Sequence, residues 1–172
     1  MKKLLLAAAA AALLCGCAGY RWTSSVPEKM RTVQVPTFRN SADLTEVGSV
    51  VTVQLLREFQ REGTFKILSD GAALEIQGEV VSASAQSEAA NYRIGSRFHG
   101  GMLKITARVS VIDKRNGRIL VDNCEYSGEA HYSAGQDNTT AMRDASGRAA
   151  DDLAQKVVDA VLAIDFNGKT EK

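Results

Sequence analysis

A long alternating segment constrains the fold of this chain more than any other feature. From Leu103 to Val111, apolar residues alternate strictly with polar ones, which is the pattern of a strand with one buried face. We predict a strand over 103–113. Asn116-Gly117 then predicts a tight hairpin turn, because both residue types tolerate positive φ. A return strand is expected over 119–132, and it places four larger side chains on one face: Leu120, Cys124, Tyr126 and Tyr132.

Two amphipathic helices can cover that face. The first is predicted over about 43–62, capped by Asn40 or Ser41 and ended at Gly63. Its apolar face recurs at three- and four-residue spacing: Leu44, Val47, Val51, Leu55 and Phe59. The second is predicted over about 140–164, with the stripe Ala149, Leu153, Val157, Ala160 and Ile164. At 1.5 Å per residue it spans ~37 Å, close to the ~36 Å of the long strand.

Three further strands complete the predicted fold. The first covers 31–38, where Pro36 predicts a sheet edge or a strand end. The next covers 64–68, and another begins at Leu74 and runs into a polar loop over 88–101. This order predicts an α+β fold: a single-domain sandwich of a mostly antiparallel four- to five-stranded sheet with two helices packed on one face. We expect the domain to cover residues 30–166, followed by a polar tail over 167–172.

Residues 1–17 have the pattern of an export signal that ends at a lipid-attachment site. Two lysines precede an unbroken apolar run of eleven residues, Leu4–Leu14. A membrane-spanning helix needs ~20 residues, so this run predicts a removed signal peptide over 1–16. The run ends in Leu-Cys-Gly-Cys, which resembles a bacterial lipobox with Cys17 as the modified residue. An ordinary signal peptide cut near Ala18 is the alternative.

An acylated Cys17 predicts a permanent membrane anchor. Each buried CH₂ is worth ~0.8 kcal/mol and a single short chain anchors only marginally. A diacylglyceryl group and an N-acyl chain together therefore hold the protein, with residues 17–29 as a tether. Ala18 follows the anchor instead of the Asp that resembles an inner-membrane retention signal. This difference favours the periplasmic side of the outer membrane.

The charge balance excludes a generic nucleic-acid binder. Removing Lys2 and Lys3 from the 21 basic residues leaves 19 against 20 acidic ones. A nucleic-acid binder needs a basic surplus to neutralise phosphates. Beyond the anchor only Cys124 remains as a thiol. It cannot form an internal disulfide, and we predict a small residue in the core.

No residue pattern predicts catalysis, a metal or a cofactor. His99 and His131 are the only histidines and do not have the spacing of metal ligands. The glycine-rich segment 95–101 lacks the lysine and the following helix of a phosphate-binding loop. Asp151 and Asp152 are adjacent on a helix, diverge by about 100°, and are expected on a solvated face. A binding or scaffolding role follows by elimination.

Basic side chains are the remaining candidates for binding. Arg93 and Arg97 lie in the predicted 88–101 loop, and Lys104 and Arg108 lie on the polar face of the long strand. A second group surrounds the predicted turn: Lys114, Arg115 and Arg118. Either group could hold the phosphates of an anionic lipid. The alternative is that turns and polar faces are simply charged.

Several segments in order resemble the LPS-assembly lipoprotein family (LptE-type). The chain opens Cys17-Ala-Gly-Tyr-Arg, and Tyr92-Arg93-Ile94-Gly95 precedes the long strand. The other matching segments are KMRTVQVPTF, LLREFQREG, FKIL, LEIQGEV, VSVIDKRNGRIL and LAQKVVDAVL. Together they cover most of the chain after the signal.

This resemblance implies a non-enzymatic plug inside a large outer-membrane β-barrel that inserts lipopolysaccharide (LPS) into the outer leaflet. It also implies that the lipoprotein assists assembly of the barrel and can bind LPS. Arg93 matches an arginine implicated in lipid binding. A second family position, a lysine two residues before an Asn, is occupied here by Gln136. This departure removes one cation, and Arg97 or Lys104 is a candidate to compensate.

Two other classes of protein stay open. Lipoprotein activators of peptidoglycan synthases also begin with a strand, a helix and a turn like Gly63-Thr64-Phe65. They would favour more parallel pairing and a longer mixed sheet, whereas the predicted 116–117 hairpin favours the LPS-assembly family. A small-molecule-binding lipoprotein or a hydrolase is the third possibility.

Overall fold

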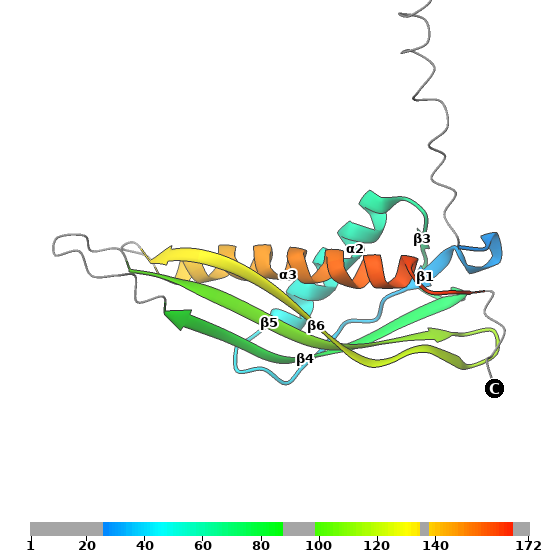
Figure 1. Ribbon diagram of the computed structural model, residues 1–172, viewed down its shortest axis with the longest axis horizontal. Helices are drawn as coiled ribbons and strands as arrows, with labels where there is room; N and C mark the ends of the chain where they lie inside the picture. Colours follow the sequence, from blue (N-terminus) through cyan, green and yellow to red (C-terminus); the bar gives the residue numbers. More distant parts are fainter. Residues whose placement is uncertain (1–25, 88–98, 135–137, 167–172) are drawn as a thin grey trace, which may run out of the picture.

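The long hairpin predicted from the sequence is the largest part of the fold. The computed structural model describes residues 26–87, 99–134 and 138–166. Three long strands, β4, β5 and β6, lie side by side and run antiparallel (Figure 1). They cover Leu74–Ser87, His99–Asp113 and Arg118–Ala134. Strand β5 begins four residues before the predicted 103, so residues 99–101, predicted as loop, are strand.

Short parallel strands extend the sheet beyond β4. They are β1, β2 and β3, at Thr32–Gln34, Arg39–Asn40 and Lys66–Ile67. The order is β3-β1-β4-β5-β6, and β2 pairs separately with β4. The sheet thus has six strands, one more than predicted, because the chain around Pro36 leaves the sheet between β1 and β2. Each parallel register spans two residues, so the sheet is mixed but antiparallel pairing dominates.

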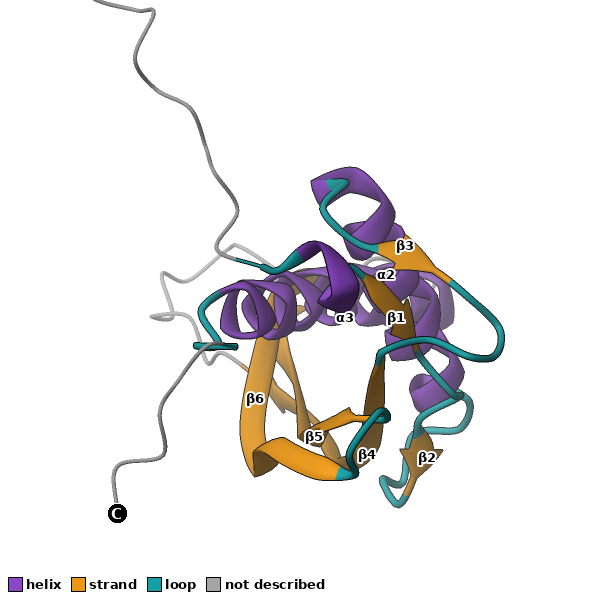
Figure 2. Cartoon of the chain, turned by 90° about the vertical axis from the view of Figure 1, so that its right-hand side faces the viewer, coloured by secondary structure: helices purple, strands orange, loops and turns teal. Residues whose placement is uncertain are grey.

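Both long helices pack on the same face of the sheet (Figure 2). A short 3₁₀ turn, η2 (Glu28–Met30), precedes them. Helix α2 (Val47–Glu62) begins after the predicted position because Asn40 does not cap it. Instead, the Asn40 side chain donates to the Leu44 carbonyl at 3.0 Å and accepts from the Ala42 amide at 3.1 Å. The helix ends as predicted at Gly63, whose φ is 79°.

Small residues let helix α3 (Asn138–Leu162) lie close to the sheet. Its buried face is rich in alanine: Ala145, Ala149, Ala150, Leu153, Ala154, Val157, Val158 and Val161. Of the predicted stripe, Ala160 and Ile164 are only half-buried. A Cβ atom at Gly128 of β6 would lie 2.0 Å from the Ala149 carbonyl oxygen and 2.5 Å from the Leu153 nitrogen. Only glycine at position 128 therefore allows this helix and this strand to meet.

The core lies between the helices and the three long strands. Its largest fully buried side chains come from every layer: Leu55, Phe59, Leu74, Ile76, Leu103, Ile105 and Leu153. Burying one such side chain stabilises the fold by roughly 2 kcal/mol. Among the described residues, no helix is both long and apolar enough to cross a membrane.

The turn between β5 and β6 differs from the prediction. Asp113 pairs with Arg118, so residues 114–117 form a four-residue loop instead of a two-residue turn. Gly117 has φ 70° and donates to the Asp113 carbonyl at 2.8 Å. Asn116 keeps a negative φ, and its side chain accepts from the Arg118 amide at 2.9 Å.

Cys124 is exposed, so the prediction of a core cysteine was wrong. The register of β5 and β6 shifts between Val109 and Val111. Beside this irregularity Asn123 has φ 46°. Strict alternation therefore fails in this part of β6. The other three residues predicted to share its face, Leu120, Tyr126 and Tyr132, are half-buried.

Because α3 lies so close to Gly128, adding one methyl group at this position should lower the stability of the domain markedly. Gly128→Ala places a Cβ against backbone atoms of α3 and should lower the free energy of unfolding by ~1–3 kcal/mol. Gly147→Ala, on α3 itself, is the matched control, since its nearest heavy atom is 3.9 Å away. That variant should gain up to ~1 kcal/mol from helix propensity. Urea denaturation measures both, and equal stability of the two variants contradicts this packing.

Candidate functional site

The open face of the sheet, opposite the helices, is polar and charge-balanced. Lys104 of β5 pairs with Glu129 of β6 at 2.9 Å. Arg108 pairs with Glu125 at 3.1 Å, four residues further along the same strands. Alternation along the strands places these side chains on one face, as predicted for Lys104 and Arg108. Each cation on this part of the face therefore has a carboxylate beside it.

A shallow groove crosses this open face next to β4. It encloses about 390 Å³ between β4 and the segment that joins β1 to β2. Arg39 and Arg108 line it together with Glu75 and Glu79, and Arg39 lies 3.7 Å from Glu79. The groove holds both signs of charge, so it does not have the cationic lining that phosphate binding requires.

Two of the three basic residues at the β5–β6 turn, Lys114 and Arg115, are in ion pairs. Arg115 donates two hydrogen bonds to Asp113, at 3.0 and 2.8 Å. These hydrogen bonds hold the pKa of the buried Asp113 carboxyl below its usual value, although burial opposes the shift. Lys114 bonds to Glu75 at 2.6 Å. Hydrogen bonds from Gln77 and Lys114 likewise lower the pKa of Glu75. The turn cations therefore stabilise the hairpin end, which supports the structural interpretation over a lipid site.

The other candidate positions lie mostly outside the described residues. Arg93, Arg97 and Gln136 fall in the segments 88–98 and 135–137. The ends of the elements that flank these segments lie at the same end of the molecule, opposite the N-terminal segment 26–30 (Figure 1, blue). Lys104 is described, and its partner is Glu129. The structure therefore locates Lys104 but does not bring the predicted cations together.

Sequence reasoning missed a row of polar contacts between α3 and the outer edge of β6. Arg148, Asp152 and Lys156 recur every four residues on α3. Arg148 donates to the His131 carbonyl at 2.7 Å. Asp152 accepts from the Glu129 amide at 2.9 Å. Lys156 donates to the Ser127 carbonyl at 2.8 Å. We call these three side chains the α3 clamp.

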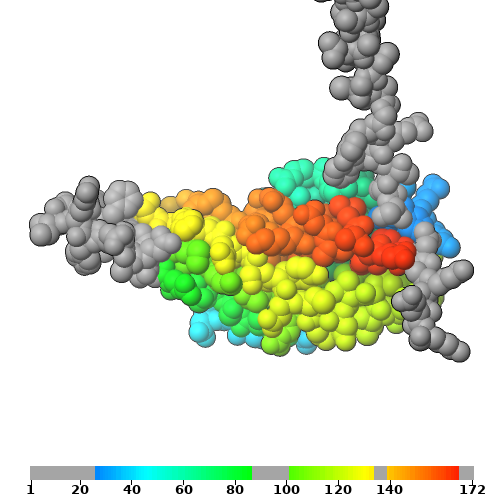
Figure 3. Space-filling view, viewed as in Figure 1, coloured from blue at the N-terminus to red at the C-terminus, as the bar shows by residue number. Residues whose placement is uncertain are grey.

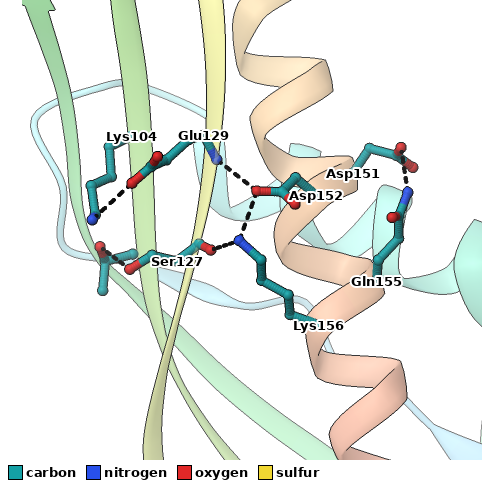
Figure 4. Close-up of polar contacts among 8 residues, drawn as sticks. Lys104, Ser127, Glu129, Asp151, Asp152, Gln155 and Lys156 are labelled. Carbon is teal, nitrogen blue, oxygen red and sulfur yellow. Dashed lines mark hydrogen bonds and ion pairs between the residues drawn. The ribbon is translucent and has the colours of Figure 1, made fainter.

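The α3 clamp satisfies backbone groups on the outer edge of β6, which has no neighbouring strand in the described part of the chain. Figure 4 shows the contacts of Asp152 and Lys156. Figure 3 shows α3 and β6 in contact side by side on one surface of the molecule. Asp152 also bonds to Lys156 at 2.9 Å. Partial burial alone would raise the pKa of Asp152, yet hydrogen bonds from Lys156 and the Glu129 amide lower it. The i, i+4 spacing of charges was the available signal in the sequence.

Asp151 and Asp152 do not act as a pair. Asp151 turns to Gln155 at 3.1 Å, away from the strand, whereas Asp152 points to β6 (Figure 4). Within the described ranges, no group of three or more His, Cys, Asp or Glu residues could hold a metal ion. Asp151 and Asp152 therefore serve in separate structural contacts.

Comparisons with known proteins agree with this architecture. The family model LptE, described as lipopolysaccharide-assembly, matches residues 30–161. A hypothetical protein from Chlamydia trachomatis has a similar fold, with a TM-score of 0.55, 10% identity, and coverage of 80% of this chain and 98% of that chain. A protein from Xanthomonas campestris gives a TM-score of 0.53, 12% identity, and coverage of 76% and 83%. No curated protein sequence matches the chain.

The ion pairs at the β5–β6 turn predict a loss of stability in acid. Because the folded-state pKa of Asp113 is lowered, its stabilisation is fully present above the usual carboxyl range near pH ~4. It is lost as the pH falls through the folded-state pKa. Asp113→Asn should cost about 1 kcal/mol at pH 7 and flatten the decline in unfolding free energy between pH 7 and 3.

Urea denaturation at several pH values measures this decline. Asp144→Asn, at an exposed position of α3, is the matched control and should keep the acid slope of the parent protein. A slope that Asp113→Asn leaves unchanged contradicts a stabilising role for the Arg115 pair.

Proposed function

The chain belongs to the lipopolysaccharide-assembly lipoprotein family LptE, and from this premise we propose that it is a plug and assembly partner of the LPS-inserting outer-membrane β-barrel. The role is non-enzymatic and needs no cofactor. In this proposal, residues 1–16 are removed and acylated Cys17 anchors the chain on the periplasmic side of the outer membrane. Residues 17–29 form the tether, and the domain over 30–166 forms the plug.

The polar open face of the sheet is the observation that carries the plug role. Large membrane barrels enclose a polar interior. A plug inside one must expose little apolar surface and must avoid a large excess of one charge. The pairs Lys104–Glu129 and Arg108–Glu125 meet the charge condition. Among the described residues, the exposed large hydrophobic side chains are Val53 and Ile119. Helix α3, with 25 residues, is ~37 Å long, which exceeds the ~25 Å apolar band of such barrels.

For lipid binding, we propose Arg93 as the main contact, with Arg97 and Lys104 as further candidates. Arg93 has the support of its matching sequence setting. Lys104 is a weaker candidate because Glu129 already neutralises its charge. A lipid phosphate would have to compete with that carboxylate. Gln136 supplies no charge where the family has a lysine.

A peptidoglycan-synthase activator remains the second candidate. The short parallel registers of β1, β2 and β3 with their neighbours make the sheet mixed, as this class would favour. The antiparallel pairs of β4, β5 and β6 nevertheless form most of the sheet. The family match and the long hairpin both favour the LPS-assembly role.

Copurification tests the plug role. Full-length tagged protein, extracted in detergent from outer membranes, should bring down one large β-barrel protein in a stable complex, identified by mass spectrometry. Cys17→Ser removes the acylated thiol and is the control for anchoring: it should reduce recovery from the membrane fraction. A synthase as the main partner, or no barrel, contradicts the proposal.

Charge reversal at Arg93 tests the lipid site. Arg93→Asp should weaken LPS binding about tenfold, which corresponds to ~1.4 kcal/mol, the scale of one charge-assisted hydrogen bond. Arg118→Asp, at the turn, is the matched control and should bind like the parent. Lys104→Gln should have a smaller effect, because Glu129 already pairs with it. Calorimetry measures the LPS affinity of each variant, and thermal unfolding checks that each variant is folded. Equal affinity of Arg93→Asp and the parent removes Arg93 from the site.

A further inference from the structure

The two outer edges of the long three-stranded sheet, at β6 and at β4, differ in the partners of their backbone groups. On the β6 side, the α3 clamp binds the backbone of Ser127, Glu129 and His131. On the β4 side, β2 pairs only with Glu79 and Val80. The last contact on that side is the Ser41 amide, which donates to the Val80 carbonyl at 2.9 Å. Beyond it, β4 continues to Ser87 without a neighbouring strand among the described residues (Figure 1).

The backbone groups that face outward on β4 can be identified from the registers. Opposite residues of an antiparallel pair either exchange both hydrogen bonds or exchange none. Since Ser127 and Glu129 direct their backbone to the α3 clamp, their partners on β5 direct theirs to β4: Thr106 and Lys104. Those two residues pair with Ser82 and Ser84. Ala83 and Ala85, which alternate with them, therefore direct their N–H and C=O groups away from β5.

Apart from one bulge at the start of this side, the described part of the chain has none of the features that normally block strand pairing here. Val81–Gln86 reads Val-Ser-Ala-Ser-Ala-Gln, without a charge or a proline. Natural proteins protect sheet edges with charges, prolines, bulges or a covering element. The one bulge lies at its start, between Val80 and Ser82. The side chains are small, so another backbone can approach closely. We call Val81–Gln86 the open edge.

We infer that the open edge binds an extended segment of the barrel partner by strand addition. This inference rests on the proposed function and names the surface through which the plug is held. Unpaired N–H and C=O groups select an extended polypeptide, because only a backbone supplies both partners at strand spacing. The wall strands of a closed barrel are already paired on both sides. The occupant is therefore a loop or terminal segment of the barrel protein, with small or polar side chains.

A second copy of this chain fits the open edge less well. Two identical edges paired about a twofold axis run antiparallel. The segment 26–30, where the proposed tether joins the domain, lies at the opposite end of the molecule from the end of β4 (Figure 1, blue). Antiparallel pairing would thus carry the two anchored ends in opposite directions. A segment from a different chain has no such restriction.

A proline substitution tests the inference. Ala85 is exposed, and its N–H makes no ladder bond, so Ala85→Pro removes one outward donor while β4 remains paired with β5. With the full-length acylated protein and its barrel partner in detergent, this variant should associate about tenfold more weakly than the parent. Ala85→Ser keeps the N–H and should associate like the parent. Thermal unfolding of both variants checks that the domain is intact.

A photo-crosslinking residue at position 85 gives a second readout that does not depend on the proline variant. The product should join position 85 to a loop or terminal segment of the barrel protein. Equal association of Ala85→Pro and the parent, or crosslinks only between copies of this chain, overturns the inference and leaves the plug role standing. Failure of the parent protein to bind any barrel overturns the plug role itself.

Discussion

The contact between helix α3 and strand β6 determines the rest of this structure. Gly128 lets the two backbones meet, and the alanine-rich face of α3 keeps them close along the hairpin. The same contact places Arg148, Asp152 and Lys156 beside the outer edge of β6. One helix therefore both covers the core and binds the outer edge of β6. It does so with adjacent faces.

Because helix α3 binds only one edge of the sheet, the surfaces of the molecule differ in character. The β6 edge is bound by α3, the helix-covered face holds the core, and the open face carries paired charges. Among the described residues, the distal part of β4 is a long stretch of strand whose outward backbone groups have no neighbouring strand. The proposed plug role requires a surface that water tolerates and at least one specific point of attachment. Under that proposal, the open face supplies the first and the open edge supplies the second.

The regular parts of the fold were predictable and the irregular parts were not. The alternation from Leu103 to Val111 and the three- and four-residue spacing in both helices report burial directly, so the fold class was confirmed. The four-residue turn and exposed Cys124 depend on a register shift that no local pattern encodes. The α3 clamp was missed since charged residues on a helix usually indicate solvent. The candidate lipid cations Arg93 and Arg97 stay predictions.

Residue-resolved hydrogen exchange of the free domain tests most directly whether one edge is closed and the other open. The Glu129 amide should be protected to the same degree as the ladder amides of β5, because Asp152 accepts its hydrogen bond. The amides of Ala83 and Ala85 should exchange near the rate of an unprotected chain. Fast exchange at Glu129, or strong protection at Ala83 and Ala85, would contradict the account.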